Sequence, residues 1–199
     1  MKKIILSAMA VLAFTITNAQ EVKFGVKVGG NVSSLNVNGG EIGDIGVLRF
    51  NSIVGVQAGG FAEIKVASNF AIQPEVLFST EGSEFGFEGT DAKINLSYVN
   101  VPVMAKYFAS EKISLQVGPQ IGFLVGAKGK MGDDSTDIKD SFKSINFGVN
   151  FGLGYDINEK VLIDFRYNLG LSNIAEEEFM GGDSKMKSSA FSLALGYKF

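Results

Sequence analysis

The feature that most constrains this chain is a strict alternation of side chains at residues 145–157, INFGVNFGLGYDI. Large apolar residues occupy every odd position, from Ile145 to Ile157, and small or polar residues occupy every even position, from Asn146 to Asp156. Because successive side chains of a β-strand point to opposite faces, this pattern predicts an extended strand with one apolar and one polar face. The question that decides the fold is which environment each face meets.

The same alternation occurs eight times along the chain. The eight segments are residues 22–35, 52–66, 70–80, 94–108, 112–126, 145–157, 161–172 and 190–199. The fourth segment breaks phase, with apolar residues at even positions up to Tyr98 and at odd positions from Val101 onward. A change of phase implies one extra residue, so we expect a β-bulge between Val99 and Pro102.

Short and long connections alternate between these segments. Tight turns are expected at residues 67–69, 110–111 and 158–160, and long loops at 36–51, 81–92, 127–141 and 173–188. An even number of antiparallel strands with short turns at one end and long loops at the other is typical of outer-membrane barrels. We therefore predict an all-β fold, an eight-stranded antiparallel up-and-down transmembrane β-barrel with short periplasmic turns and long extracellular loops.

Two kinds of barrel show such alternation: a soluble, lipocalin-like barrel with its apolar face inside, and a membrane barrel with its apolar face in lipid. The apolar set comprises more than about 40 side chains, which would overfill an eight-stranded interior. The opposite set is rich in Gly, Ser, Asn and Gln, whereas a soluble exterior would carry many lysines and glutamates. We therefore expect the apolar face to contact lipid. Tyrosines within or near strand ends are expected to form interfacial girdles: Tyr98, Tyr107, Tyr155, Tyr167 and Tyr197.

The first residues, MKKIILSAMAVLAFTITNAQ, have the organisation of a secretory signal peptide. Two lysines precede an uncharged apolar run from Ile4 to Ile16, and small residues follow up to Ala19. This run is shorter than the about 20 residues that a membrane-spanning helix needs. We expect residues 1–19 to be a signal peptide and residues 20–199 to form one β-barrel domain in the cell outer membrane.

Composition excludes several classes of function. The chain has no histidine and no cysteine, and so lacks the usual general base, the commonest metal ligand and any thiolate or disulfide. A formal net charge of −3 does not suit binding to nucleic acid. No two carboxylates stand at a catalytic spacing on one strand. We expect neither an enzyme nor a cofactor.

Acidic residues in the third long loop are the remaining candidates for a metal site. In the sequence GKMGDDSTDIKDS they are Asp133, Asp134, Asp137 and Asp140. Calcium prefers such oxygen ligands, but the spacing does not match the EF-hand run. Lysines are interleaved with the acids, so we interpret this segment as a solvated loop and expect no metal.

Charged residues of the inward set lie a few residues from the short-turn ends of their strands. They are Lys27, Glu63, Glu75, Asp164 and Arg166. Because an isolated buried charge is costly, such charges should pair inside the barrel. We predict a structural lumen charge network that plugs the barrel. The alternative is a path for protons or solutes through the same residues.

Three stretches carry a resemblance to a known family: FGVKVGGNVSSL, GGFAEIKVASNFAIQPEVLFSTEG and YVNVPVMAKYF. Together they resemble the outer membrane protein beta-barrel family that is abundant in Bacteroidetes, whose members are often named porin family or PorT family proteins. That family usually has an acidic residue before the Val-Pro pair, where this chain has Asn100. The resemblance implies an eight-stranded barrel but little about activity, so the word porin is not evidence of a channel.

Members of outer-membrane families also tend to end in an aromatic residue that the barrel assembly machinery reads. Phe199, with Tyr197 two residues before it, is similar to that signal. The other interpretation is that Phe199 only completes a lipid-facing strand.

Three functions remain compatible with the sequence. The first is a structural or surface-interaction barrel that contacts outer-membrane lipid, lipopolysaccharide or a protein partner through its extracellular loops. The second is an accessory subunit of an outer-membrane secretion machine, and the third is a narrow porin-like channel. In the second loop, Phe85 and Phe87 could anchor a partner, although we expect them to fold back over the barrel mouth.

Overall fold

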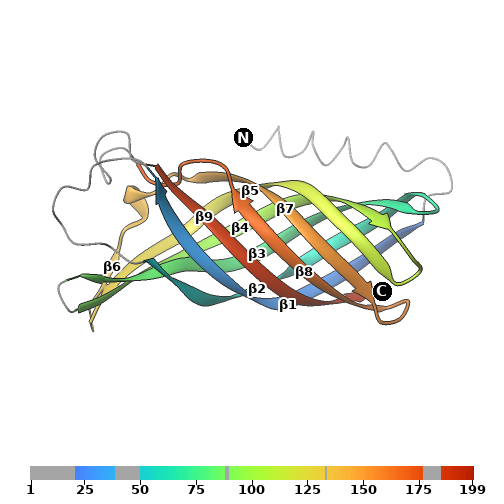
Figure 1. Cartoon of the computed structure of the whole chain (residues 1–199), viewed down its shortest axis with the longest axis horizontal. Coiled ribbons are helices and arrows are strands. Elements are labelled where there is room, and N and C mark those ends of the chain that lie inside the picture. Colours follow the sequence, from blue (N-terminus) through green and yellow to red (C-terminus); the bar gives the residue numbers. More distant parts are fainter. Residues whose placement is uncertain (1–20, 39–49, 88–89, 133, 177–184) are drawn as a thin grey trace.

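The computed structural model describes residues 21–38, 50–87, 90–132, 134–176 and 185–199, and these are almost entirely strand (Figure 1). The elements are β1 (Val22–Asn38), β2 (Phe50–Ala67), β3 (Phe70–Phe87), β4 (Thr90–Phe108), β5 (Ile113–Met131), β6 (Asp134–Asp137), the 3-10 turn η1 (Lys139–Ser141), β7 (Ile145–Asp156), β8 (Val161–Gly170) and β9 (Lys185–Lys198). The predicted signal peptide, residues 1–19, lies outside the described residues. Within the described ranges no helix has the length and hydropathy needed to cross a membrane.

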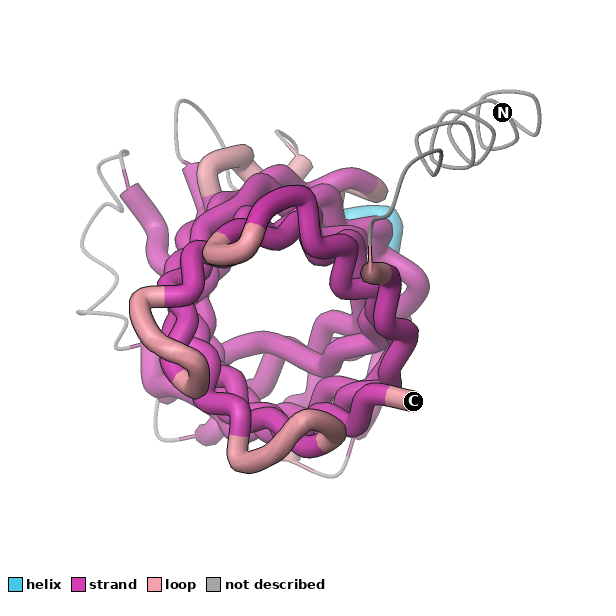
Figure 2. Tube along the Cα trace, turned by 90° about the vertical axis from the view of Figure 1, so that its right-hand side faces the viewer, coloured by secondary structure: helices cyan, strands magenta, loops and turns pink. Residues whose placement is uncertain are grey.

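Eight of the strands close into a ring. The hydrogen-bonded order is β4-β3-β2-β1-β9-β8-β7-β5, and β4 also pairs with β5, so the sheet has no open edge along the ring. Every pairing is antiparallel, and Figure 2 shows the closed ring seen along its axis. The short β6 lies outside the ring and extends the long-loop end of β5. The predicted eight-stranded antiparallel barrel is confirmed.

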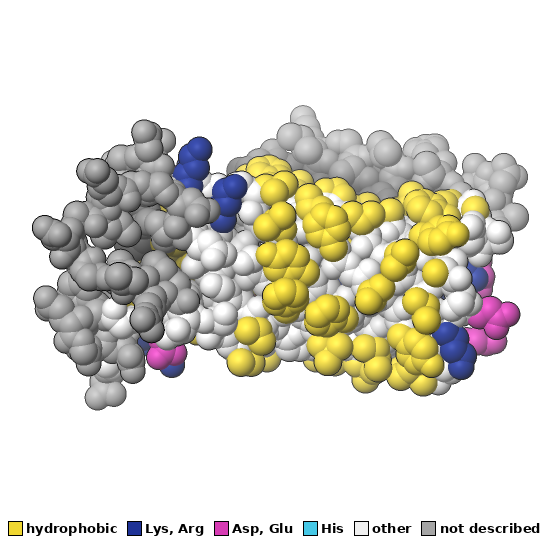
Figure 3. All heavy atoms as spheres, in the orientation of Figure 1, with side chains coloured by type: hydrophobic (Ala, Val, Ile, Leu, Met, Phe, Trp, Pro, Cys, Tyr) yellow, Lys and Arg dark blue, Asp and Glu magenta, His cyan; other side chains and the backbone are white. Residues whose placement is uncertain are grey.

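The outer wall carries the apolar face, which answers the question raised by residues 145–157. In β7, Phe151 is 50 % exposed whereas Asn150 is buried at 4 %. Figure 3 shows hydrophobic side chains in a wide band that stops short of the long-loop end, with a few charged side chains beyond it. In β1 the outward apolar positions run from Phe24 to Val32, a length that suits the about 9–11 residues of a tilted transmembrane strand.

The inner wall changes character along the barrel. Towards the short turns polar and charged side chains predominate, with Phe61, Met104 and Leu162 buried among them, and towards the long loops the wall is mainly apolar. The apolar part is one cluster of buried residues: Leu35, Ile94, Leu96, Tyr98, Leu124, Ala127, Phe142, Ile174, Ala175 and Met186. Phe85 and Ile138 are half-buried against it. For Phe85 the packing agrees with folding back over the barrel mouth, whereas the side chain of Phe87 lies outside the described residues.

The cluster of buried apolar residues just described is called the loop-end core below. It shows that the predicted bulge between Val99 and Pro102 is wrong. Even positions of β4 point inward from Ala92 through Leu96 and Tyr98 to Lys106, so the phase of β4 does not change over these residues. The apolar residues change sides because the interior itself becomes apolar. Ile94, Leu96 and Tyr98 therefore face the lumen and not lipid, and Tyr98 is not a girdle residue.

A register irregularity exists, but it lies elsewhere. It falls between Ser97 and Tyr98 in the pairing of β4 with β5. On β5 the inward positions shift from Leu124 to Ala127 across it, so the extra residue belongs to β5. The other girdle candidates lie on the outer wall. Tyr107, Tyr155 and Tyr197 are exposed near the short-turn ends of β4, β7 and β9, and Tyr167 is half-buried on β8.

The lengths predicted for the loops also need correction. Residues 81–92 are mostly a hairpin, because β3 continues to Phe87 and β4 begins at Thr90. β5 likewise continues to Met131, within the predicted third loop. The apolar core inside the loop end gives these extensions a buried face, so the strands persist beyond the outer apolar band. The three short turns occur where the sequence predicts them.

Candidate functional site

All five residues of the predicted lumen charge network point inward and are buried. They come from four strands: Lys27 from β1, Glu63 from β2, Glu75 from β3, and Asp164 and Arg166 from β8. Each occupies the polar phase of its strand, so the alternation alone turns it into the lumen. The structure brings four of the five into direct contact and places Glu63 in a neighbouring group.

The central cluster consists of Lys27, Glu75, Asp164 and Arg166, none more than 5 % exposed. The guanidinium of Arg166 donates to both carboxylate oxygens of Glu75, with Nη1 at 2.9 Å and Nη2 at 2.7 Å, and Nη2 also donates to Asp164 at 3.1 Å. The ammonium of Lys27 donates to Glu75 at 3.1 Å and to Asp164. Two cations thus share two carboxylates, and the cluster is formally neutral.

Two glutamines complete the hydrogen bonding of this cluster. Gln116 Nε2 donates to Asp164 at 2.6 Å, and its Oε1 accepts from Arg166 Nε at 3.0 Å. Gln73 Nε2 donates to Glu75 Oε1 at 2.6 Å. Buried charges are tolerated when their remaining hydrogen-bonding capacity is also satisfied, and the two amides supply that here.

A second group, the turn-end cluster, lies closer to the short turns and consists of Glu63, Lys106, Lys198 and Asp156. Lys106 Nζ donates to Glu63 at 2.6 Å. Lys198 Nζ donates to Glu63 at 3.2 Å and pairs with Asp156 at 3.1 Å. Gln73 links the two clusters, because its Oε1 accepts from Lys106 at 3.1 Å. This group is also formally neutral.

Three members of the turn-end cluster, Lys106, Lys198 and Asp156, were not predicted from the sequence as part of the network. All three occupy the polar phase of their segments, so the signal was present in the alternation. Lys106 was obscured by the apparent change of phase in β4, and Lys198 and Asp156 stand at strand ends, where inward and outward positions are hardest to tell apart.

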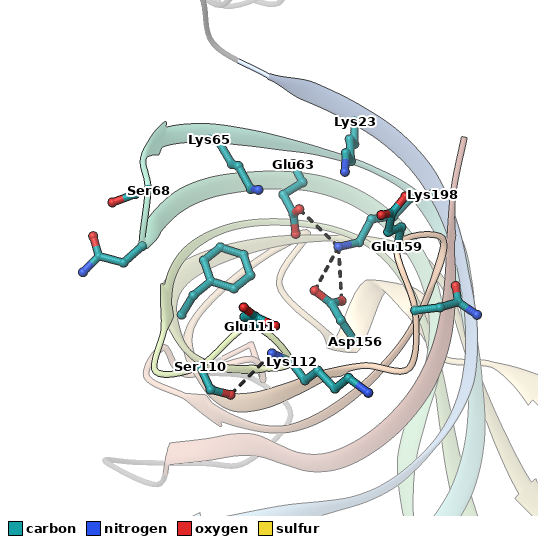
Figure 4. Close-up of a pocket in the computed structure, with 13 residues that line it drawn as sticks. Lys23, Glu63, Lys65, Ser68, Ser110, Glu111, Lys112, Asp156, Glu159 and Lys198 are labelled. Carbon is teal, nitrogen blue, oxygen red and sulfur yellow. Dashed lines mark hydrogen bonds and ion pairs between the residues drawn. The ribbon is translucent and has the colours of Figure 1, made fainter.

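Three residues of the turn-end cluster, Glu63, Asp156 and Lys198, line an open vestibule at the short-turn mouth, with a volume of about 510 Å³ (Figure 4). Its rim carries both signs of charge, including Lys112, Glu111 and Glu159. Glu21, just before β1, pairs with Lys23 at 3.0 Å, and the hydrogen bond and charge of Lys23 lower the pKa of Glu21.

A third layer separates the central cluster from the loop-end core and is centred on Glu81. Its carboxylate accepts from Ser79 Oγ at 3.0 Å, from Ser188 Oγ at 3.0 Å and from Asn100 Nδ2 at 3.4 Å. Among the described residues no cation lies within ion-pair distance of it. Asn100, which stands where the resembling family has an acid, therefore serves here as a donor to Glu81.

Chemically, these layers can neutralise and fill a narrow interior. The described residues contain no group of three or more acids, histidines or cysteines that could hold a metal ion. In the third loop, Asp134, Asp137 and Asp140 are exposed, and Asp133 lies outside the described residues. Phe199 is 74 % exposed, and its backbone N–H donates to the carbonyl of Phe24 at 2.9 Å, so it closes β9 onto β1.

Comparison with known proteins agrees with this architecture. Residues 18–176 match the family model described as outer membrane protein beta-barrel domain. The chain belongs to this family. It is therefore a protein of the outer membrane, and its outer apolar band contacts lipid. No curated protein sequence matches the chain.

Solved structures that are similar to this chain are distant from it in sequence. Neisserial surface protein A is 16 % identical with a TM-score of 0.54, covering 90 % of this chain and 99 % of that one. Ail of Yersinia pestis is 17 % identical with a TM-score of 0.49, covering 90 % and 99 %. The Escherichia coli outer membrane protein W is 18 % identical with a TM-score of 0.41, covering 92 % and 100 %. At these identities the likeness concerns the fold alone.

Proposed function

We propose that this protein is a closed outer-membrane β-barrel with a structural or surface-interaction role and no catalytic activity. Its lumen is plugged by the central and turn-end clusters below and by the loop-end core above. Lipid and lipopolysaccharide are its surroundings, and its extracellular strands and loops are the surface available to a protein partner.

The observation that carries the proposal is the neutral pairing of four cations with four carboxylates across the lumen. A conducting pore needs a continuous aqueous path, whereas these side chains are hydrogen-bonded to one another, and all are buried except Asp156, whose side chain is 20 % exposed. Between the central cluster and Glu81 the lumen has a cavity of about 30 Å³, which has room for ordered water and little else.

Planar-bilayer recording tests this function. The purified full chain is expected to give no steady conductance at neutral pH. A lumen variant that removes three side chains of the clusters at once, Glu75→Ala with Lys106→Ala and Arg166→Ala, serves as the positive control for an opened barrel. Discrete conductance steps in the unaltered protein would overturn the plugged lumen and favour the narrow channel.

The alternative role as an accessory subunit of a secretion machine predicts a different result. Mild-detergent extraction should then recover the protein in a large complex, whereas the structural or surface role predicts a monomer or a small assembly with lipid. Size-exclusion chromatography with light scattering separates the two.

The assembly role of Tyr197 and Phe199 is also a proposal. The exposed ring of Phe199 lies edge-on to Tyr197, with centroids 5.6 Å apart, and so presents an aromatic pair at the end of β9. Deleting Phe199 should lower the yield of folded barrel in the outer membrane while in vitro refolding in detergent proceeds normally. Equal membrane yield would limit Phe199 to lipid contact.

A further inference from the structure

The outer wall formed by β8, β9, β1 and β2 carries two adjoining hollows, one apolar and one polar at its rim. We propose that they form a binding site for one phosphate-bearing lipid of the outer leaflet, with an acyl chain in the apolar groove and the phosphate on Lys187. This proposal deepens the surface-interaction role and rests on it, because it requires the long-loop end to face the outer leaflet.

The apolar groove lies within the outer band and has a volume of about 330 Å³. Its walls are Val32, Val54, Phe165, Phe191 and Leu193, and its floor is Gly30. Outward positions of β1 carry large side chains from Phe24 to Val32 except at Gly30, so the groove exists because one side chain is missing. An apolar hollow of this size on the lipid-facing wall suits a hydrocarbon chain.

The second hollow, of about 350 Å³, lies next to the groove on the long-loop side. Tyr167, Leu169 and Leu171 line one part of it, whereas Asn36, Lys187 and Ser189 line the other. Asn36 Nδ2 donates to Ser189 Oγ at 3.0 Å, so the hydroxyl hydrogen of Ser189 is left to donate outward. The hollow thus combines an apolar wall with an ammonium and a hydroxyl donor.

The register of the strands places the two hollows next to each other, with the Phe191 and Tyr167 side chains between them. Phe191 pairs with both Val32 and Tyr167, and the rings of Phe191 and Tyr167 are 4.6 Å apart at the junction. Lys187 is two outward positions above Phe191 on β9, on the side of the long loops. An amphiphile whose chain lies in the groove therefore has its headgroup beside Lys187.

Charge complementarity selects an anionic headgroup. No carboxylate among the described residues lies within ion-pair distance of Lys187, and Lys185 is exposed at the next outward position of β9. Figure 3 shows basic side chains at the border where the hydrophobic band ends. A phosphate accepts charge-assisted hydrogen bonds from lysine, and basic residues at a membrane surface favour anionic lipids.

Two substitutions separate the chain site from the headgroup site. Gly30→Leu fills the groove, and the fold tolerates a side chain there because a Cβ at Gly30 would meet only the Gly55 carbonyl, at 3.7 Å. Its control is Gly60→Leu on β2, where a Cβ would meet only the Gly25 carbonyl, at 3.6 Å. Lys187→Gln removes the charge, with Lys128→Gln on the exposed side of β5 as its control.

The experiment measures lipid binding to the full chain in phosphatidylcholine nanodiscs by native mass spectrometry. The probes are diphosphorylated lipid A, its dephosphorylated form and inorganic phosphate. We expect Gly30→Leu to weaken binding of both lipid A forms about tenfold. Lys187→Gln should weaken only the phosphorylated form, also about tenfold. Both controls should stay within about twofold of the unaltered protein.

Three results would overturn the proposal: equal binding by all variants, no preference for the phosphorylated form in the unaltered protein, or displacement of the lipid by inorganic phosphate alone. None of these results alters the conductance expected from the plugged lumen. Failure of the lipid site and failure of the proposed function are therefore distinguishable.

Discussion

The two halves of this barrel have opposite distributions of polarity. In the half near the short turns, charged residues such as Glu75 and Arg166 fill the inside and Val76 and its neighbours face outward. In the half near the long loops, Leu96 and Tyr98 fill the inside, whereas Lys93 and Ser97 lie on the outer side of β4. The first half is organised as a membrane barrel and the second as a soluble one.

The difference shows that polarity follows the solvent and not the fold. One closed sheet continues through both halves, with the same strands and the same antiparallel ladders. Where lipid covers the wall, apolar side chains are stable outside, and the narrow lumen takes polar groups. Beyond the lipid, water covers the wall and the hydrophobic effect drives apolar side chains inward. Substitutions in each half can test this division.

The largest effect is expected from Glu75→Gln in the membrane half. The substitution leaves Lys27 and Arg166 with only Asp164 as a carboxylate partner inside the lumen. Breaking a buried ion pair typically costs about 3–5 kcal/mol. Urea unfolding of the protein in detergent micelles measures this loss of unfolding free energy. Glu84→Gln, which breaks the partly exposed pair with Lys93, is the control and should cost less than about 1 kcal/mol. Equal stability of the two variants would count against the plug.

The next largest loss of stability is expected in the half of the barrel near the long loops. Leu96→Ala should lower the free energy of unfolding by about 2–5 kcal/mol, because Leu96 is fully buried in the apolar core. Ser97→Ala, one position along and on the outer side of β4, is the matched control and should change stability by less than about 0.5 kcal/mol. An unchanged midpoint for Leu96→Ala would mean that this core does not stabilise the barrel.

A lysine scan of the outer wall sharpens the comparison further. Val76→Lys places a charge in the lipid-covered band and should cost about 2–4 kcal/mol, whereas Ser97→Lys lies at or above the interface and should cost about 0–1 kcal/mol. Both measurements use refolding into phosphatidylcholine vesicles. A larger cost for Ser97→Lys than for Val76→Lys would mean that lipid surrounds the long-loop half of the barrel, against the assignment of lipid to the short-turn half.

The smallest effect is expected from Glu81→Gln, at the boundary between the halves. Glu81 has no cation within ion-pair distance among the described residues. An amide oxygen in place of Oε1 can still accept from Ser79, and the amide nitrogen in place of Oε2 can donate to the hydroxyl oxygen of Ser188. The loss should stay near about 1 kcal/mol, well below that of Glu75→Gln. A larger loss than at Glu75 would show that the charge of Glu81 matters more than its hydrogen bonds.

Much of the fold follows from the alternation of residue types. In β7 one phase is apolar and the other polar over the whole strand, so the strand, its faces and its lipid contact could all be predicted. The inward direction of Lys27, Glu63, Glu75, Asp164 and Arg166 followed in the same way. Their partners could not be predicted, because contact between charges on different strands depends on register and shear.

The loop-end core shows where such a prediction fails. The rule applied to β4 was that apolar residues mark the outer face, which holds only where lipid lies outside. The rule therefore predicts a lipid-facing side for Ile94, Leu96 and Tyr98 and requires a bulge, whereas all three side chains are buried in the lumen. When the apolar residues of a strand change phase without a bulge, the change marks the position along the strand at which the outer wall passes from lipid to water.

A scan of lipid and water accessibility along β4, which crosses both halves, would separate the two environments residue by residue. The chain has no cysteine, so single-cysteine variants with a spin label can be made without background. In lipid vesicles, labels at Val101, Val103 and Ala105 should collide with oxygen, and labels at Lys93, Asn95 and Ser97 with a water-soluble nickel complex. Water accessibility at Val103 equal to that at Lys93 would contradict the conclusion that the outer wall passes from lipid to water along this strand.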